Sequence, residues 1–387
     1  MPQLAKHDMC TGCLACVFSC PRHCLNIEID EYGFSFPGLF DQEHCINCGV
    51  CEKSCPVLNH KELYKSTRAF AAYSLNTDIR SDSSSGGIFS ELALEIIDQG
   101  GYVYGASYDE NFKIHHICVD SKEKLGLLRG AKYAQSNLHN CFERIKKQVK
   151  EGKPVLFSGT PCQIAGLKSF LNKDYNNIFF VDFVCHGVPS PMVWEKYVKY
   201  RAESDNEGKM PVKINLRSKH TGWSHYKYSN LFIYDNNVRY SVESGSDLFM
   251  KLFVGDYINR ESCSNCQFKG FKRQSDITIA DFWGIWDVRP GMDDGKGTSA
   301  VLVHSKKGKQ LFNNISKRIK FEEVSFEEIS QQNPSILISS KANKMRESIL
   351  TMIQEGKIEE VKLMLLRKSK KSFMRRTLEK VKRAFGK

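Results

Sequence analysis

Short apolar segments alternate with amphipathic ones along most of the chain, and this pattern predicts its secondary structure. Apolar runs of strand length are followed by segments whose apolar residues recur every three or four positions, the period of a helix. The expected strands are residues 69–75, 102–108, 113–119, 155–158, 178–184 and 277–279. The expected helices are residues 88–99, 138–150, 162–171 and 192–201. This alternation predicts a mixed α/β layer structure.

Three regions depart from that alternation. In residues 25–40, apolar and polar residues alternate over two short stretches, which predicts a small hairpin. Residues 213–240 predict antiparallel strands with a turn at residues 235–237. From about residue 336 the pattern predicts helix with increasing charge.

One cysteine spacing occurs twice in the first sixty residues. The runs are Cys10, Cys13, Cys16 and Cys20 before Pro21, and Cys45, Cys48, Cys51 and Cys55 before Pro56. The spacing is that of bacterial ferredoxins, in which the fourth cysteine of each run binds the other cluster. We therefore predict two 4Fe–4S clusters. Their expected ligands are Cys10, Cys13, Cys16 and Cys55 for the first cluster, and Cys45, Cys48, Cys51 and Cys20 for the second.

Other uses of these cysteines fit the pattern less well. A disulfide framework needs an oxidising compartment, and no signal peptide is recognisable at the N-terminus. Zinc sites use paired CxxC knuckles rather than a triple run that ends in Cys-Pro. We expect a cytoplasmic protein whose clusters are sensitive to oxygen.

Composition describes an ordinary globular chain with an unevenly placed charge. The 387 residues suffice for two or three domains, and no apolar run approaches the roughly 18 residues of a membrane-spanning helix. Of the net charge of +12, residues 367–387 carry +9, from ten Lys or Arg and one Glu, which leaves +3 for the rest. The basic balance belongs to the C-terminal tail, so we expect no nucleic-acid partner.

The basic tail also carries an apolar stripe. Met374, Leu378, Val381 and Phe385 fall on one helical face, and Lys or Arg fill the others. A basic amphipathic helix can lie on an anionic membrane, which would place the protein peripherally at the inner face. A solvated tail explains the same residues equally well.

Four later cysteines are placed for ligation. Cys162 and Cys185 each follow an expected strand, and Cys263 and Cys266 form a CxxC in a polar loop. A third 4Fe–4S cluster, a zinc ion and a set of buried thiols all remain open. The three remaining cysteines, Cys24, Cys118 and Cys141, lack the spacing of metal ligands, and we expect them to pack in the core.

Two loops contain candidate groups for binding a cofactor. Ser85, Gly86 and Gly87 precede an expected helix, where backbone amides and the helix N-terminus can bind phosphate. An ordinary helix cap has the same sequence. Lys132 and Ser136 lie in a later loop and are plausible dinucleotide contacts, although a plain loop is also consistent with them.

Two residues are candidates for catalysis. Asp281 follows the expected strand at 277–279 and precedes Phe282 and Trp283; it can be functional or cap a turn. His186 adjoins Cys185 and can contact a cofactor, act as a general acid, or be a structural histidine.

Taken in order, these segments resemble the family of β-subunits of the coenzyme F420 (deazaflavin) hydrogenases and dehydrogenases. The resemblance runs from about residue 69 to about residue 304, with the dicluster module fused in front. It rests on six short segments: residues 85–87, 130–133, 159–163, 185–189, the Cys263/Cys266 pair and 281–284.

The resemblance implies an iron–sulfur flavoprotein that carries FAD. It implies electron transfer from a donor such as ferredoxin to an organic substrate, and similar fused bacterial proteins are found among surface-polysaccharide genes. No feature selects a deazaflavin over another electron partner. A protein that only relays electrons to a separate enzyme is the alternative function.

We therefore expect an α+β protein: a dicluster ferredoxin-like module, a mixed α/β flavin-binding domain and a C-terminal helical tail. The expected divisions are residues 1–60 for the ferredoxin module, 69–150 and 151–335 for the two regions that resemble the β-subunits, and 336–387 for the basic tail.

Overall fold

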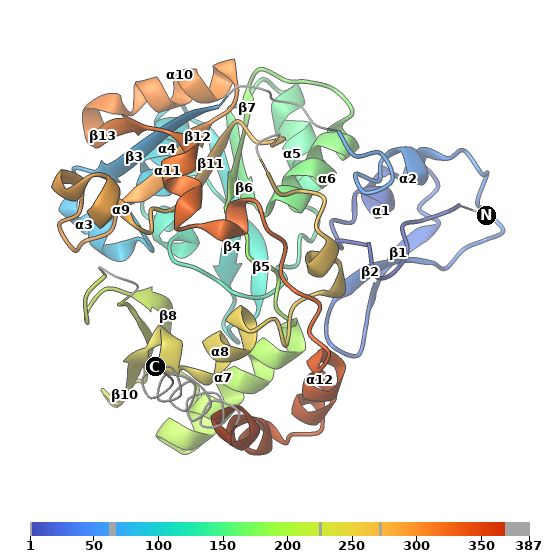
Figure 1. Ribbon diagram of the computed structural model, residues 1–387. Helices are drawn as coiled ribbons and strands as arrows, with labels where there is room; N and C mark the ends of the chain where they lie inside the picture. Colours follow the sequence, from blue (N-terminus) through green and yellow to red (C-terminus); the bar gives the residue numbers. More distant parts are fainter. Residues whose placement is uncertain (1, 62–66, 224–226, 271–272, 368–387) are drawn as a thin grey trace, which may run out of the picture.

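The computed structural model describes residues 2–61, 67–223, 227–270 and 273–367 (Figure 1). Its N-terminal module contains two short helices, α1 (Ala15–Ser19) and α2 (Val50–Lys53), and one hairpin. The hairpin strands β1 (Leu25–Ile29) and β2 (Ser35–Leu39) pair antiparallel. The hairpin predicted for residues 25–40 is therefore confirmed.

An eight-stranded mixed sheet forms the centre of the body, with the strand order β13-β3-β12-β11-β7-β6-β4-β5. The strands are β3 (Arg68–Ser74), β4 (Tyr102–Tyr108), β5 (Ile114–Val119), β6 (Val155–Gly159), β7 (Ile178–Phe183), β11 (Ile277–Asp281), β12 (Ser299–Val303) and β13 (Ile319–Val324). Strands β4, β6, β7 and β11 pair parallel, whereas β5 and β12 are antiparallel to their neighbours. The carboxyl ends of β6, β7 and β11 therefore meet at one edge, where open α/β sheets bind ligands.

Helices cover both faces of this sheet. Alternate residues of β3 face opposite cores: Phe70 packs with α4 and α10, and Ala71 lies in the core beside α9 and α11. Helices α5 and α6 form a further core against β6 and β7. The helices of the body are α3 (Thr77–Asp82), α4 (Ile88–Asp98), α5 (Cys141–Lys150), α6 (Pro161–Leu171), α9 (Ile285–Val288), α10 (Lys306–Asn314) and α11 (Phe326–Gln331). This layered arrangement agrees with the expected α+β class.

A second lobe lies beyond the ligand-binding edge of the sheet, below it in Figure 1. Its antiparallel sheet contains β8 (Lys213–Ser218), β9 (Ser229–Ile233) and β10 (Arg239–Glu243), which confirms the excursion predicted for residues 213–240. Helices α7 (Pro191–Asn206), α8 (Leu248–Val254) and α12 (Arg346–Gln354) cover it, together with a further helix over residues 358–367. Its core combines aliphatic side chains with large aromatic ones, which include Trp194, Tyr197, Phe232 and Phe249.

The N-terminal module is attached to both lobes. Helix α1 packs against α6, and Cys13 and Ala15 belong to the core of the body. At the hairpin tip, the Tyr32 carbonyl accepts hydrogen bonds from the Met192 amide (3.3 Å) and the Ser190 hydroxyl (2.5 Å). The Tyr32 hydroxyl lies 3.4 Å from the Thr351 hydroxyl of α12.

The C-terminal prediction is wrong in part. Residues 337–345 are not helical, because polar contacts hold them along the body. The Lys341 amide donates to Asp256 Oδ2 (2.9 Å), and the Asn343 side chain donates to the Gly255 carbonyl (2.8 Å). Helix begins only at Arg346, and Ile349 and Ile353 are buried in the second lobe.

Two further expectations are limited by the described range. The apolar stripe of Met374, Leu378, Val381 and Phe385 lies outside the described residues. In the part of the chain that is described, no helix combines the length and apolarity needed to traverse a membrane.

Candidate functional site: three cysteine sets beside a large cavity

The fourth cysteine of the first run lies with the first three of the second run. A cavity of about 240 Å³ is lined by Cys20, Cys45, Cys48 and Cys51. Cys20 Sγ accepts a hydrogen bond from the Cys24 amide (3.3 Å). Hydrogen bonds to sulfur of this kind are one of the factors that set cluster reduction potentials. We call these four cysteines the distal set; they are the residues expected to bind the second cluster.

The other N-terminal cysteines form a second group, the proximal set, which contains Cys10, Cys13, Cys16 and Cys55. Burial raises the pKa of the Cys16 thiol, and the nearby Cys13, Cys10 and Cys55 raise it further. Neighbouring buried thiols ionise at a high cost unless a cation compensates their charge. Iron supplies such a charge, so the donor chemistry of this set fits a cluster.

The four later cysteines also meet, although they come from three separate segments of the chain. Helix α6 starts with a capping box in which Thr160 and Gln163 satisfy each other's backbone amides, and this fixes Cys162 in the first turn. Cys185 follows β7. Cys162, Cys185, Cys263 and Cys266 line one small cavity. We call them the inner set.

Positive side chains surround the inner set. Arg260, Lys269 and Arg273 line the same cavity. Burial raises the pKa of Cys185, the Lys269 ammonium opposes that rise, and Cys263, Cys162 and Cys266 add to it. Arg260 Nη2 and Arg273 Nη2 are buried without a hydrogen-bond partner in the described part of the chain. An anionic metal–thiolate group would complement these cations.

The spacing of the thiols bears on which metal group fits. Within residues 2–61, 67–223, 227–270 and 273–367, no three Cys, His, Asp or Glu side chains form a group suited to one metal ion. A zinc ion holds its sulfurs about 2.3 Å from one centre, whereas each thiolate of a cubane binds a different iron. Four thiolates that each bind a different iron are the donors that the predicted clusters require.

The proximal and inner sets are neighbours. Helix α6 carries Gly166 against the proximal set, where a Cβ would lie only 3.0 Å from Cys13 Sγ. Cys162, at the start of the same helix, is close enough to contribute to the raised pKa of Cys13. Cys162 and Cys185 also line a second, much larger cavity. Thr11 and Gly12 of the proximal run line the large cavity as well, so the proximal and inner sets both border it.

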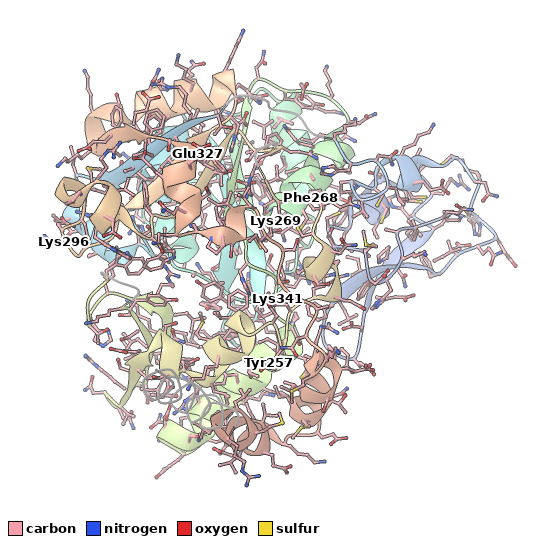
Figure 2. The ribbon with its side chains drawn as sticks, viewed as in Figure 1. Tyr257, Phe268, Lys269, Lys296, Glu327 and Lys341 are labelled. Carbon is pink, nitrogen blue, oxygen red and sulfur yellow. The ribbon has the colours of Figure 1, made fainter. Side chains whose placement is uncertain are left out.

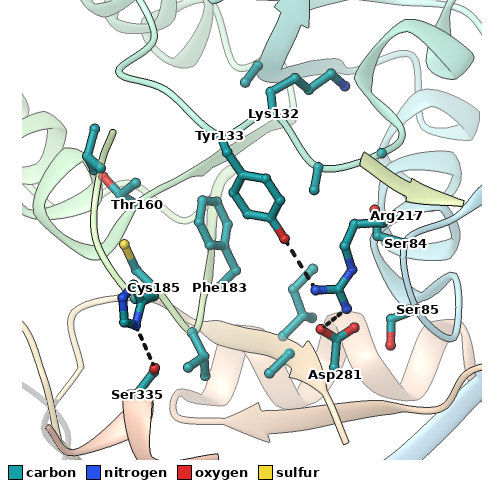
Figure 3. A pocket seen from close by; sticks show the side chains of 18 of the residues that line it. Ser84, Ser85, Lys132, Tyr133, Thr160, Phe183, Cys185, Arg217, Asp281 and Ser335 are labelled. Atoms are coloured by element: carbon teal, nitrogen blue, oxygen red, sulfur yellow. Dashed lines mark hydrogen bonds and ion pairs between the residues drawn. The ribbon is translucent and has the colours of Figure 1, made fainter. Parts of the chain in front are cut away.

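The large cavity has a volume of about 980 Å³ and opens where β6, β7 and β11 end opposite the second lobe (Figure 3). Its wall includes most of the cofactor-binding and catalytic residues expected from the sequence. Those residues are Ser85, Gly87, Lys132, Ser136, His186 and Asp281.

The serine–glycine loop forms part of this wall at the start of α4. Gly87 is the N-cap residue, and its φ of +85° is a conformation that glycine adopts without strain. Gly86 serves packing instead: its amide donates to Ser299 Oγ (2.9 Å), and a Cβ there would lie 2.5 Å from the Ala72 carbonyl oxygen. Ser84 Oγ is buried without a partner among the described residues. A phosphate group would supply an acceptor for that hydroxyl.

Lys132 and Ser136 line the same cavity. Lys132 Nζ donates to the carbonyls of Leu127 (3.1 Å) and Arg129 (2.6 Å), and burial lowers its pKa to about 7. Ser136 Oγ lies 2.9 Å from Nδ1 of His116. His116 Nε2 is 3.0 Å from the Ser158 carbonyl oxygen, and burial lowers the His116 pKa to about 4.

Asp281 forms an ion pair with Arg217 of β8, as Figure 3 shows. The Arg217 guanidinium also donates to the Tyr133 hydroxyl (3.3 Å) and lies 4.1 Å from the ring centre of Tyr228. The indole of Trp283 is 5.3 Å away. Arg217 was missed by the sequence analysis, since one arginine in a polar strand gives no signal of burial.

His186 is held by protein groups on both ring nitrogens. Nε2 lies 2.8 Å from Asp256 Oδ1, and Nδ1 lies 3.4 Å from Ser335 Oγ. His186 follows Cys185 in the chain and lines both the cavity of the inner set and the large cavity. These contacts orient the imidazole and suit the structural alternative.

The remaining cysteines divide by location. Cys24 lines the distal cavity beside Cys20. Cys141 is 3% exposed in the core under α5, and Cys118 packs against that core. The latter two lie among apolar side chains, as expected for packing residues.

Two parts of the chain match known families. Residues 9–59 match the 4Fe-4S dicluster domain, and residues 152–329 match the family described as the C terminus of the beta subunit of coenzyme F420 hydrogenase/dehydrogenase. One subunit of the F420H2 dehydrogenase of Methanosarcina mazei is 24% identical over 182 residues, which are 42% of this chain and 48% of that protein. The chain thus spans about half the length of that relative.

A solved structure was also matched. A chain of the F420-reducing NiFe hydrogenase complex from Methanosarcina barkeri, studied as a xenon derivative, gives a TM-score of 0.47 at 16% sequence identity. The match covers 77% of this chain and 91% of that chain.

Proposed function

Because the chain joins a 4Fe–4S dicluster domain to a C-terminal domain of the coenzyme F420 hydrogenase/dehydrogenase β-subunits, we propose that this electron-transfer protein is a flavin-dependent oxidoreductase. Electrons enter from ferredoxin or a similar donor and pass through the distal and proximal clusters. They continue through a third cluster on the inner set to FAD in the large cavity, and from there to an organic substrate.

One observation carries this proposal: the inner set borders both the proximal set and the large cavity. Cys162 is near Cys13 on one side and lines the large cavity on the other. Cys185 lines both the small and the large cavity. A cluster there would give electrons a short route through the protein instead of ending at the surface of the module.

The large cavity fits a dinucleotide flavin by size and by chemistry. Its volume of about 980 Å³ is at the upper end of the usual range for ligand sites, about 300–1,000 Å³. The N-terminus of α4 and the unpaired hydroxyl of Ser84 suit a phosphate. Arg217 Nε is likewise buried without a partner in the described residues. When bound, a flavin exchanges electrons singly or in pairs, which links one-electron clusters to an organic substrate.

The side chains of the wall contribute charge and protons. Lys132 can take up or release a proton at Nζ near neutral pH because burial lowers its pKa to about 7. Asp281 fixes the Arg217 guanidinium, and Arg217 in turn bridges to Tyr133. We assign Asp281 this positioning role, and His186 the corresponding role beside Cys185.

Anaerobic isolation of the full chain tests the proposal directly. We expect about twelve iron and twelve sulfide per chain, four of each for every cluster, and about one FAD. Dithionite reduction followed by EPR integration should account for three clusters. Eight iron and no flavin in freshly isolated protein would contradict the proposed path and leave only the dicluster module.

The relay alternative predicts a different result with the same material. The relative from Methanosarcina mazei is named as one part of a larger dehydrogenase, which favours a partner enzyme. A relay would carry clusters and pass electrons to that enzyme, but substrate analogues would not perturb its flavin spectrum. Spectral perturbation by a small organic ligand in the isolated chain would favour the enzyme.

The substrate class and the membrane contact rest on sequence alone. We propose a substrate from surface-polysaccharide biosynthesis, supported only by the family resemblance. Contact of the basic tail with an anionic membrane surface would place the protein near lipid-linked intermediates. Co-sedimentation with anionic liposomes, with and without residues 367–387, tests the contact; equal binding by both forms would discard it.

A further inference from the structure

Arg260 connects the proximal and inner cysteine sets. It lies three residues before Cys263, and the Cys263 amide donates to the Arg260 carbonyl (3.0 Å). From this loop its side chain extends into the N-terminal module, where Nε donates to the carbonyl of Cys10 (2.7 Å). One side chain therefore contacts a proximal cysteine from a loop that carries an inner one.

The guanidinium is held rigidly in this position. The residue is 2% exposed, and its Cζ lies 3.9 Å from the ring centre of Phe36 in β2. Nη1 donates to Gln135 Oε1 (3.3 Å), whose amide also donates to the Gly12 carbonyl (3.4 Å). Nη2 is buried and has no hydrogen-bond partner in the described residues.

The electrostatic environment of Arg260 includes both sets. Burial acts to lower its pKa, whereas Cys10, Cys263 and Cys162, followed by Asp30, oppose that effect. The two thiols that oppose it most strongly thus come from different sets. Arg260 also lines the cavity of the inner set. Because arginine stays protonated in proteins, its positive charge is permanent.

We propose that Arg260 is a positioning residue shared by two clusters, whose fixed charge raises the reduction potentials of both the proximal and the inner cluster. This inference rests on the proposed function, since it requires a cluster on the inner set. A cluster with four thiolate ligands is anionic and becomes more so on reduction. A buried cation stabilises the reduced state more than the oxidised one.

Lys269 provides a matched comparison (Figure 2). It lines the inner cavity, and its ammonium donates to the carbonyls of Cys185 and of Ser335 (2.8 Å for the latter). No contact with the proximal set involves it among the described interactions. Its charge should therefore act on the inner cluster alone.

An EPR-monitored redox titration of the anaerobic full-length protein tests the inference. Arg260→Met should lower the midpoint potentials of two clusters relative to wild type, and Lys269→Met that of one. Arg260→Lys, which keeps the charge, should stay close to wild type. If Arg260→Met lowers the midpoint potential of only one cluster, or of none, Arg260 is not shared by two clusters. If Arg260→Lys lowers the potentials as much as Arg260→Met does, the charge of Arg260 is not the cause.

Iron analysis separates this inference from the proposed function. Wild-type protein with eight rather than about twelve iron per chain would refute the inner cluster before any variant is made. Twelve iron per chain, with midpoint potentials that are the same in wild type and in Arg260→Met, would refute only the role of Arg260. If Arg260→Met does not fold, Arg260→Gln replaces it; loss of the inner cluster alone in that variant would also overturn the sharing.

Discussion

The distal and inner cysteine sets are brought together by different routes. Three of the four distal cysteines come from one short run, so local spacing alone keeps them close together. The inner set draws on the start of α6, the end of β7 and the loop around η4 (Glu261–Asn265), which meet only in the folded body. A ligand set built by local sequence should tolerate changes elsewhere, whereas one built by the fold should depend on it.

The largest expected effect tests the local set. Cys20→Ala should remove the distal cluster and about four of the iron atoms, because Cys20 is the ligand supplied by the other run. Iron and sulfide analysis with EPR measures this loss. Cys24→Ala is the control: Cys24 lines the same cavity four residues later, and that variant should retain its iron. Equal iron loss in both variants would refute the assigned ligands.

The next largest expected effect concerns the inner set, which only the folded body brings together. Cys185→Ala should remove the inner cluster while both N-terminal clusters keep their EPR signals. Electrons from dithionite-reduced clusters should then reach the flavin at least about 10-fold more slowly, because one step of the path is missing. Stopped-flow absorbance measures that rate. Cys141→Ala, which alters a buried thiol under α5, should leave it unchanged.

A third prediction concerns the cavity beyond the inner set. Arg217→Met should weaken flavin retention and destabilise the body by about 3 kcal/mol, since it leaves the Asp281 carboxylate without its partner. Flavin content and anaerobic urea unfolding report the two effects. The double variant Arg217→Met/Asp281→Leu should recover part of the stability but not the flavin. A double variant as unstable as the single one would contradict the ion-pair explanation.

The smallest expected effect is a pH dependence of the stability of the body. Burial lowers the pKa of His116 to about 4, below its ordinary value of 6.5. The unfolded chain therefore binds a proton between these values while the folded chain does not, so stability falls as pH decreases from about 6.5 to about 4. The slope is about 1.4 kcal/mol per pH unit for this group.

Urea unfolding at pH 7 and pH 5.5 tests this dependence, and His116→Gln should reduce it. His304, whose pKa burial lowers to about 3, maintains part of the slope in that variant. His139→Asn is the control because His139 is exposed and has φ of +43°, which asparagine tolerates. An unchanged slope in His116→Gln would refute the assignment.

Sequence patterns predicted the elements that have a strong local signal. The strand at 102–108 has the expected bounds, and α4 and α6 each differ from the prediction by one residue at an end. The helix expected at 138–150 starts three residues later, at Cys141. Elements without a distinct signal were missed, including β12, whose five residues are all buried in the sheet.

The site was predictable only as far as its motifs are local. The division of the N-terminal cysteines into the distal and proximal sets was predictable, because the ferredoxin spacing determines which cysteines share a cluster. The inner cysteines were identified individually, but their joint cavity depends on strand order. Arg217 and Arg260 were not identified, since a lone arginine gives no sign that it will be buried between distant segments.

The contact between Tyr32 and α12 affects the order of events during synthesis. The hairpin leaves the ribosome early, but its partner Thr351 follows more than three hundred residues later. The N-terminal module therefore emerges, and can receive iron and sulfide, long before the helix that its hairpin contacts has been translated. The inner pocket cannot be complete until Cys266 has been translated, more than two hundred residues after the last cysteine of the N-terminal runs.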